Sequence, residues 1–135
     1  ELSNYRIKDY VFSWDKVLNF EGETGPYVQY THARACSILR RAGEDTVKAA
    51  KKGFDTSWIT GESAHHLIKL LYALPSIVTR HIVDIAQGFN KFYHDEHILV
   101  EDEKEKTAKV ALVLAVQTAI KNGLGLLGMK APEKM

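Results

Sequence analysis

The sequence has little of what stabilises small secreted proteins and little of what interrupts helices. Its single cysteine, Cys36, excludes an internal disulfide and favours a reducing compartment, so we expect a cytoplasmic protein. It contains only three prolines in 135 residues, which leaves long stretches of helix-forming residues. No apolar run approaches the roughly 20 residues needed to cross a bilayer. The chain is therefore expected to be an all-α domain without a membrane partner.

The sequence also lacks a strong charge of either sign. Its 18 basic and 17 acidic residues give a net charge of +1, so nothing attracts the whole chain to polyanions. Any nucleic-acid site must therefore be a local patch. The first residues, Glu1–Tyr5, show no basic stretch followed by an apolar one, which argues against a signal peptide. The absence of an initial methionine indicates a piece of a longer protein.

Residues for catalysis or metal binding are also missing. His94 and His97 are three positions apart, but a zinc site needs three or four converging ligands and the only thiol lies in another predicted helix. The stretch Gly22–Pro26 resembles a phosphate loop without its Lys-Ser/Thr pair. The acidic stretch Glu101–Glu105 is typical of a solvated helix start. We expect no metal, cofactor or catalytic residue in this chain.

Start and stop residues divide the chain into five or six helices of one compact bundle. The clearest start is Thr24 as a cap followed by Pro26 in the first turn, and Gly43 is the expected stop of that helix. Asn122-Gly123 is expected to interrupt the last long helix before a final turn at Leu124–Leu127. The expected helices are Ser13–Gly22, Pro26–Ala42, a weak one at Val47–Lys51, Glu62–Ala73, Pro75–His94 and Glu101–Lys121.

Apolar residues recur in these helices at three- and four-residue steps, which predicts one buried face on each. Gly88 interrupts one such helix and is expected to allow a neighbouring helix to pack closely. The expected core comprises Val28, Leu39, Leu70, Ile82, Ile85, Phe89, Leu112 and Val116.

The helix from Pro26 carries two different arcs when residues are placed about 100° apart. One arc is apolar and predicts the core face: Val28, His32, Ala35, Leu39 and Ala42. The other combines aromatic and cationic residues: Tyr27, Tyr30, Arg34, Ser37 and Arg41. Such an edge offers rings for stacking single-stranded bases and guanidiniums for phosphates. The competing interpretation is that the tyrosines are packing residues and the arginines are merely solvated. Tyr93 is either a second base platform or a boundary tyrosine.

Four segments, in order, resemble one known family. They are DYVFSWDKVLNFEGE at Asp9–Glu23, TGPYVQYTHAR at Thr24–Arg34, DIAQGFNKFYHD at Asp84–Asp95 and NGLGLLGMKAPEKM at Asn122–Met135. Together they resemble the C-terminal anticodon-binding domain of arginyl-tRNA synthetases, which are class I aminoacyl-tRNA synthetases. This domain is often named after a D-A-L-R sequence. The four segments span well over half of the chain.

The resemblance implies an all-helical domain, residues 1–135, that grips the anticodon stem-loop of tRNA(Arg). Residues that match positions near the anticodon loop in the family are Tyr27, Tyr30, Arg34, Tyr93 and Met135. Further candidates for tRNA contact are Arg41, Asn90 and His97. The resemblance thus selects the same helix edge as the residue pattern.

Two departures from the family pattern limit what this chain can do. Motifs for ATP are absent, so the chain alone is not expected to be an enzyme. Its parent is implied to be an ATP-dependent arginine–tRNA ligase, whose catalytic domain precedes residues 1–20 and holds ATP and arginine. Family members also usually carry an extra helical stretch where this chain is fused at Leu74-Pro75, so the resemblance does not define the architecture around Ala73–Ser76. The alternative function is a helical protein-docking module without RNA specificity.

Overall fold

The computed structural model describes residues 13–17, 24–73 and 78–135. These ranges contain six α-helices and one short 3-10 helix, and no strand. This confirms the all-α prediction. The expected helix at 18–22, the helix start at 75–76 and the junction at 74–75 lie outside the described residues. The elements are α1 (Trp14–Val17), α2 (Gly25–Ala42), α3 (Glu44–Lys52), η1 (Thr56–Trp58), α4 (Glu62–Tyr72), α5 (Val78–Asp95) and α6 (Glu103–Leu126).

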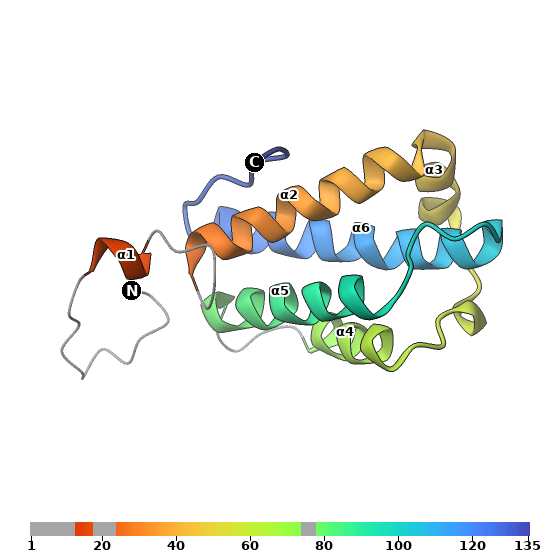
Figure 1. The fold of residues 1–135 in the computed structure, drawn as a ribbon, viewed down its shortest axis with the longest axis horizontal. Helices are drawn as coiled ribbons and strands as arrows, with labels where there is room; N and C mark the ends of the chain where they lie inside the picture. The colour runs from red at the N-terminus through yellow and green to blue at the C-terminus, as the bar shows by residue number, and fades with distance from the viewer. Residues whose placement is uncertain (1–12, 18–23, 74–77) are drawn as a thin grey trace.

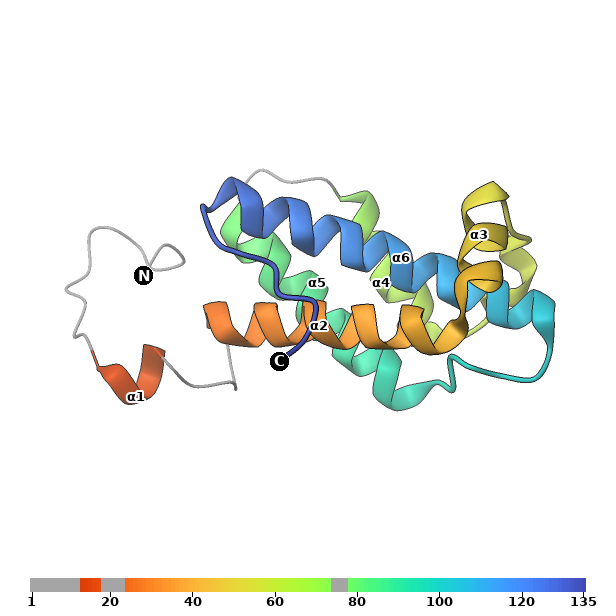
Figure 2. The same ribbon diagram turned by 90° about the horizontal axis from the view of Figure 1, so that it is seen from above.

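The long helix α6 runs through the middle of the bundle (Figure 1). α2 and α3 pack against it on one side and α5 on the other, and α4 packs against α5. After α6 the chain turns back and crosses α2, so the C-terminus lies beside the middle of that helix (Figure 2). None of the helices in the described ranges is both long and apolar enough to cross a bilayer.

The start and stop of α2 follow the predicted local chemistry. The Thr24 hydroxyl accepts a hydrogen bond from the Tyr27 backbone N–H at 3.2 Å, which satisfies one of the unpaired donors at the helix start. Pro26 lies in the first turn, where no N–H is needed. Gly43 ends the helix with a φ of 86°, a conformation that favours glycine. α2 therefore covers the range expected from the sequence.

The weak helix expected at Val47–Lys51 is longer in the structure. α3 has nine residues and begins directly after Gly43. Acidic residues in its first turn and lysines in its last turn both interact favourably with the helix dipole. Ala50 is buried and Val47 is partly buried against the core. Packing against α6 therefore stabilises a segment whose composition alone indicated only marginal helicity.

The interruption expected at Asn122-Gly123 is wrong. α6 continues through both residues to Leu126, because this part of the helix is buried against α5. A Cβ at Gly123 would overlap the Ile82 side chain, so the glycine permits close approach of the two helices. Gly88 likewise permits the close packing predicted for it, here between α5 and α4, since a Cβ there would lie 2.7 Å from the Leu70 Cδ1. Helix–helix contact thus outweighs the low helix propensity of glycine.

The core lies where α2, α4, α5 and α6 meet. Its largest completely buried side chains include Phe89, Phe92, Leu67, Ile120 and Leu124. Of the expected core residues, two are only partly buried, Leu39 and Leu70. The buried ones are Val28, Ile82, Ile85, Phe89, Leu112 and Val116.

A charged cluster around the buried Lys109 joins the turn after α5 to α4 and α6. The Lys109 Nζ is 2.9 Å from a Glu105 carboxylate oxygen and 3.5 Å from the Glu96 carboxylate, and it donates to the His97 carbonyl at 3.0 Å. The other Glu96 oxygen accepts from the Ser63 hydroxyl at 2.8 Å, near the start of α4. The buried Lys109 ammonium thus has two carboxylate partners, as stability requires. The cluster fixes the connection that follows α5.

Candidate nucleic-acid interface

Two tyrosine rings and one guanidinium form a stack between α2 and α5. The Cζ of Arg34 lies 4.8 Å from the ring centroid of Tyr30 and 5.0 Å from that of Tyr93. Tyr30 and Arg34 are one helical turn apart on α2, and Tyr93 comes from the end of α5. Both tyrosines remain about two-fifths exposed, at 39% and 42%. Each ring therefore keeps surface that another planar group can cover.

The partly buried side chain of Asn90 holds this stack in place through hydrogen bonds to α2. Its Oδ1 accepts from an Arg34 guanidinium nitrogen at 2.7 Å, and its Nδ2 donates to the Tyr27 hydroxyl at 2.8 Å and to the Thr31 hydroxyl at 3.1 Å. A second guanidinium nitrogen donates to the Tyr30 hydroxyl at 3.2 Å. The guanidinium plane is therefore fixed by directed hydrogen bonds as well as by the rings.

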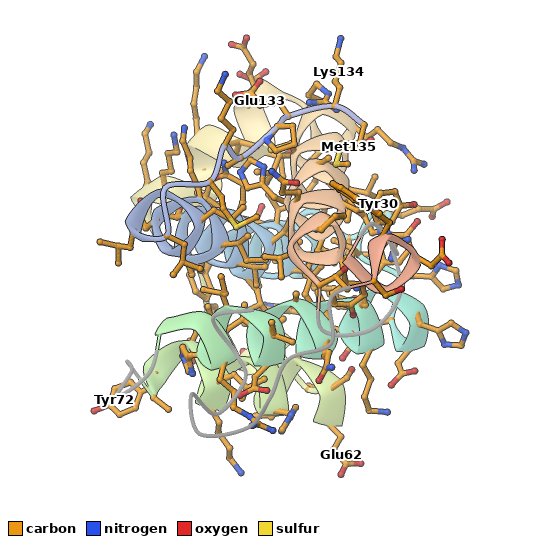
Figure 3. All side chains as sticks on the ribbon, turned by 90° about the vertical axis from the view of Figure 1, so that its left-hand side faces the viewer. Tyr30, Glu62, Tyr72, Glu133, Lys134 and Met135 are labelled. Carbon is orange, nitrogen blue, oxygen red and sulfur yellow. The ribbon has the colours of Figure 1, made fainter. Side chains whose placement is uncertain are left out.

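The stack borders a shallow depression of about 460 Å³. Its lining includes three cations, Arg34, Arg40 and Lys134. Met135, which is 59% exposed, adds an apolar side chain from the end of the chain. Figure 3 shows Tyr30 and Met135 on the same side of the molecule, away from the α4 residues at its lower end. Stacking surfaces, cations and an apolar wall thus meet in one place.

The candidate residues occupy three kinds of position. Four line the depression: Tyr30, Arg34, Tyr93 and Met135. Tyr27 and Asn90 are partly buried and support Arg34 from behind. Arg41 is exposed but does not line the depression. His97 lies in the turn after α5 with its carbonyl bound by Lys109, also outside the lining. The structure therefore brings six of the eight candidate residues together, either in the lining of the depression or in support of Arg34.

Sequence reasoning missed two cations of this surface. Arg40 lines the depression although its neighbour Arg41, on the chosen arc, does not. Lys134 reaches it because the chain after α6 folds back over α2. The helix phase read from the sequence selected Arg41, whereas Arg40 lies beside the returning tail and donates to the Glu133 carbonyl. The position of Lys134 depends on a contact across the fold and has no local pattern.

Cys36 is buried on α2 next to His32 and does not line the depression. Burial raises the pKa of its thiol, and the nearby Glu133 carboxylate raises it further. A protonated, inaccessible thiol is a poor nucleophile. Cys36 is therefore a packing residue of α2.

The chain is similar to known arginyl-tRNA synthetases in both sequence and fold. The chain matches the arginine–tRNA ligase of Halothermothrix orenii with 51% identity over 147 aligned positions, covering all of the chain and 25% of that protein. The structure matches the Thermus thermophilus arginyl-tRNA synthetase with a TM-score of 0.74 and 32% identity, covering 87% of this chain and 22% of that one. It matches the arginyl-tRNA synthetase of Plasmodium falciparum with a TM-score of 0.77 and 27% identity, covering 99% and 25%.

The family model for the DALR anticodon binding domain matches residues 28–135. The chain belongs to this family. It spans about a quarter of the length of the curated relatives it matches. The alignment to the Halothermothrix protein is longer than the 135 residues of this chain, so that relative carries additional residues within the matched region.

Proposed function

We propose that this chain binds the anticodon stem-loop of an arginine-accepting tRNA, as the anticodon-binding part of an arginine–tRNA ligase. The observation that carries the proposal is the stack of Arg34 between Tyr30 and Tyr93, beside the cations Arg40 and Lys134. Bases that leave the helical stack of an anticodon loop need ring faces, and their phosphates need nearby positive charge. This surface supplies both.

The two tyrosines suit base stacking because their rings are exposed yet held in place. Each stacked base contributes about 1–3 kcal/mol to binding, as judged by removing the ring. A ring that is already ordered loses less conformational entropy when the RNA binds. Tyr27 and Asn90 contribute indirectly, because they orient Arg34. Met135 provides an apolar contact at the rim.

The remaining parts of the proposal concern the whole ligase. The catalytic domain of the same polypeptide, joined through residues 1–20, would bind ATP and arginine and perform the ATP-dependent aminoacylation in the cytoplasm. Residues 1–135 would act as a single domain that selects and positions the tRNA. We propose no cofactor for these residues. Their contribution to the reaction is recognition.

The direct test is a titration of this chain with the anticodon stem-loop of an arginine-accepting tRNA and with a non-cognate stem-loop. We expect tighter binding of the cognate RNA, and binding that weakens as salt rises. Equal affinity for both RNAs, or no binding of either, would contradict the proposal.

The second candidate function is a protein-docking domain. It is favoured by exposed apolar side chains on α4, where Tyr72 is 90% exposed and Ile68 is 38% exposed. They lie away from Tyr30 and Met135, as the position of Tyr72 in Figure 3 illustrates. Recovery of a partner protein that survives ribonuclease treatment and is lost on Tyr72→Ser substitution would support docking through this helix.

A further inference from the structure

The chain beyond α6 is directed back over α2 by a turn at Gly128. The Gly128 N–H donates to the Gly125 carbonyl at 3.0 Å and the Met129 N–H to the Leu124 carbonyl at 2.9 Å, the pattern that closes many helices. Gly128 has a φ of 70°, which favours glycine. Met129 and Ala131 then pack against the core. The last residues thus follow a defined path along α2 (Figure 2).

Three side chains of α2 hold this tail by its backbone. The Gln29 amide donates to the Lys130 carbonyl at 2.8 Å, the His32 Nδ1 to the Pro132 carbonyl at 2.9 Å, and Arg40 to the Glu133 carbonyl at 3.2 Å. At about 100° per residue these donors form one stripe, next to the arc that carries Tyr30 and Arg34. Because the acceptors are main-chain carbonyls, the contacts fix the path of the tail whatever its side chains are.

His32 is the buried member of this stripe. It is completely buried, and both of its ring nitrogens have partners. A carbonyl can only accept, so the Nδ1 carries the proton given to Pro132, while the Nε2 lies 3.1 Å from the Gln117 side-chain amide on α6. Gln117 therefore sets the orientation in which His32 reaches the tail.

We propose that His32 and Gln29 are positioning residues for RNA binding, because they hold the tail so that Lys134 and Met135 form one wall of the depression. The inference rests on the proposed function for its RNA partner. Neither residue lines the depression itself. Their effect on RNA is indirect, through the two tail residues that do. Preordering those side chains removes a conformational cost that the RNA would otherwise have to offset.

The test separates tail position from RNA affinity. The chain has two methionines, Met129 and Met135, so labelling the methionine methyl groups with ¹³C gives two NMR signals. Met135 lines the depression with Tyr30 and Tyr93, so we expect their rings to shift its methyl signal. Met129, next to Gly25, serves as an internal reference. Binding of the cognate anticodon stem-loop is measured on the same samples.

Four variants provide matched comparisons. Gln29→Leu keeps the size of a partly exposed side chain and removes its donor. His32→Gln retains a polar group near Gln117 but not at the position of the Nδ1, whereas His32→Asn retains one near the Nδ1. Gln87→Leu makes the same change at an exposed site on α5 that lines a different groove, and serves as the control.

We expect Gln29→Leu and His32→Gln to move the Met135 signal towards that of a free chain and to weaken RNA binding about three- to tenfold. His32→Asn should be less affected, and Gln87→Leu should match the parent chain. Gln29→Leu, at a partly exposed position, keeps the test independent of any loss of folding at His32. An unmoved Met135 signal, or a moved signal with unchanged affinity, would overturn the inference. Failure of the parent chain to bind the stem-loop would overturn the proposed function instead.

Discussion

Arg34 on α2 is bound to Asn90 on α5, with 2.7 Å between a guanidinium nitrogen and the amide oxygen. This bond joins two helices that are far apart in the sequence and lies directly beneath the exposed tyrosines. The same amide donates to the Tyr27 hydroxyl, so it is oriented from both sides. The cation is consequently held between the rings before any ligand arrives.

Replacing Tyr30 by Ala should weaken binding of the anticodon stem-loop by about 1–3 kcal/mol, the loss expected for one stacked base. Folding should change less, because the ring is 39% exposed and lies off the buried face of α2. Isothermal titration and thermal unfolding on the same samples check both values. Tyr30→Phe, which keeps the ring, should bind more tightly than Tyr30→Ala.

Lys104→Ala is the control for a general loss of charge, because Lys104 is exposed at the far end of the bundle, in the first turn of α6. It should change binding little. If Tyr30→Ala unfolds the domain while the remaining folded fraction binds normally, Tyr30 is a packing residue and the RNA edge is wrongly assigned.

Arg34→Lys tests whether the planar guanidinium matters beyond its charge. Lysine keeps the charge but cannot lie flat between Tyr30 and Tyr93 while donating to Asn90. We expect weaker binding with a similar salt dependence. Arg34→Ala should weaken binding as well and lower the log–log salt slope by about 0.7–0.9 if one phosphate contact is lost. If Arg34→Lys bound the stem-loop as tightly as the parent chain across a salt series, RNA binding would depend only on the positive charge at this position.

The sequence predicted the parts of this molecule that depend on local chemistry. Thr24 as a cap, Gly43 as a stop and the buried stripe through Phe89 were all predicted correctly, because each depends on residues within a turn or two. The continuation of α6 through Gly123 was not, since it depends on the Ile82 side chain from another helix.

The same distinction applies to the candidate site. Tyr30 and Arg34 could be paired from the period of one helix. Asn90 was a further candidate for tRNA contact, but its role in holding Arg34 depends on how α5 packs against α2. Lys134 was missed because its position depends on the return of the chain over α2. The sequence alone therefore could not predict which residues the packing of the helices brings together.

Cys36 should react slowly with iodoacetamide at neutral pH, because burial and the nearby Glu133 raise the pKa of its thiol. The rate should rise only at higher pH than for a free cysteine. The raised pKa also predicts the sign of a stability change. Above about pH 8.5 the unfolded thiol ionises while the folded one stays protonated, so stability falls as pH rises.

The measurement is the alkylation rate as a function of pH, followed by mass spectrometry, with a denatured sample as the reference for an accessible thiol. Cys36 is the single cysteine of the chain, so the rate needs no site assignment. Reaction of the folded chain as fast as that of the denatured one at neutral pH would contradict the buried position.

Gly123 and Gly125 lie two residues apart in α6 and should respond in opposite ways to alanine. At Gly125 an added Cβ meets nothing within 4 Å, so Gly125→Ala should stabilise the domain by about 0.5–1 kcal/mol through helix propensity alone. At Gly123 the same change gains that propensity but drives a Cβ into Ile82. Overpacking of this kind costs about 1–3 kcal/mol, so the net effect should be destabilising.

Urea unfolding of the two single variants measures this difference, and a double variant tests its cause. Ile82→Ala alone should destabilise the domain by about 2–5 kcal/mol because it removes buried side-chain volume. In the Gly123→Ala background the same change should cost less, since it also relieves the overlap, and this non-additivity identifies a direct contact. If Gly123→Ala were as stabilising as Gly125→Ala, the close approach of α5 and α6 at this point would be wrong. If the two changes added without coupling, the cost at Gly123 would arise from some contact other than that with Ile82.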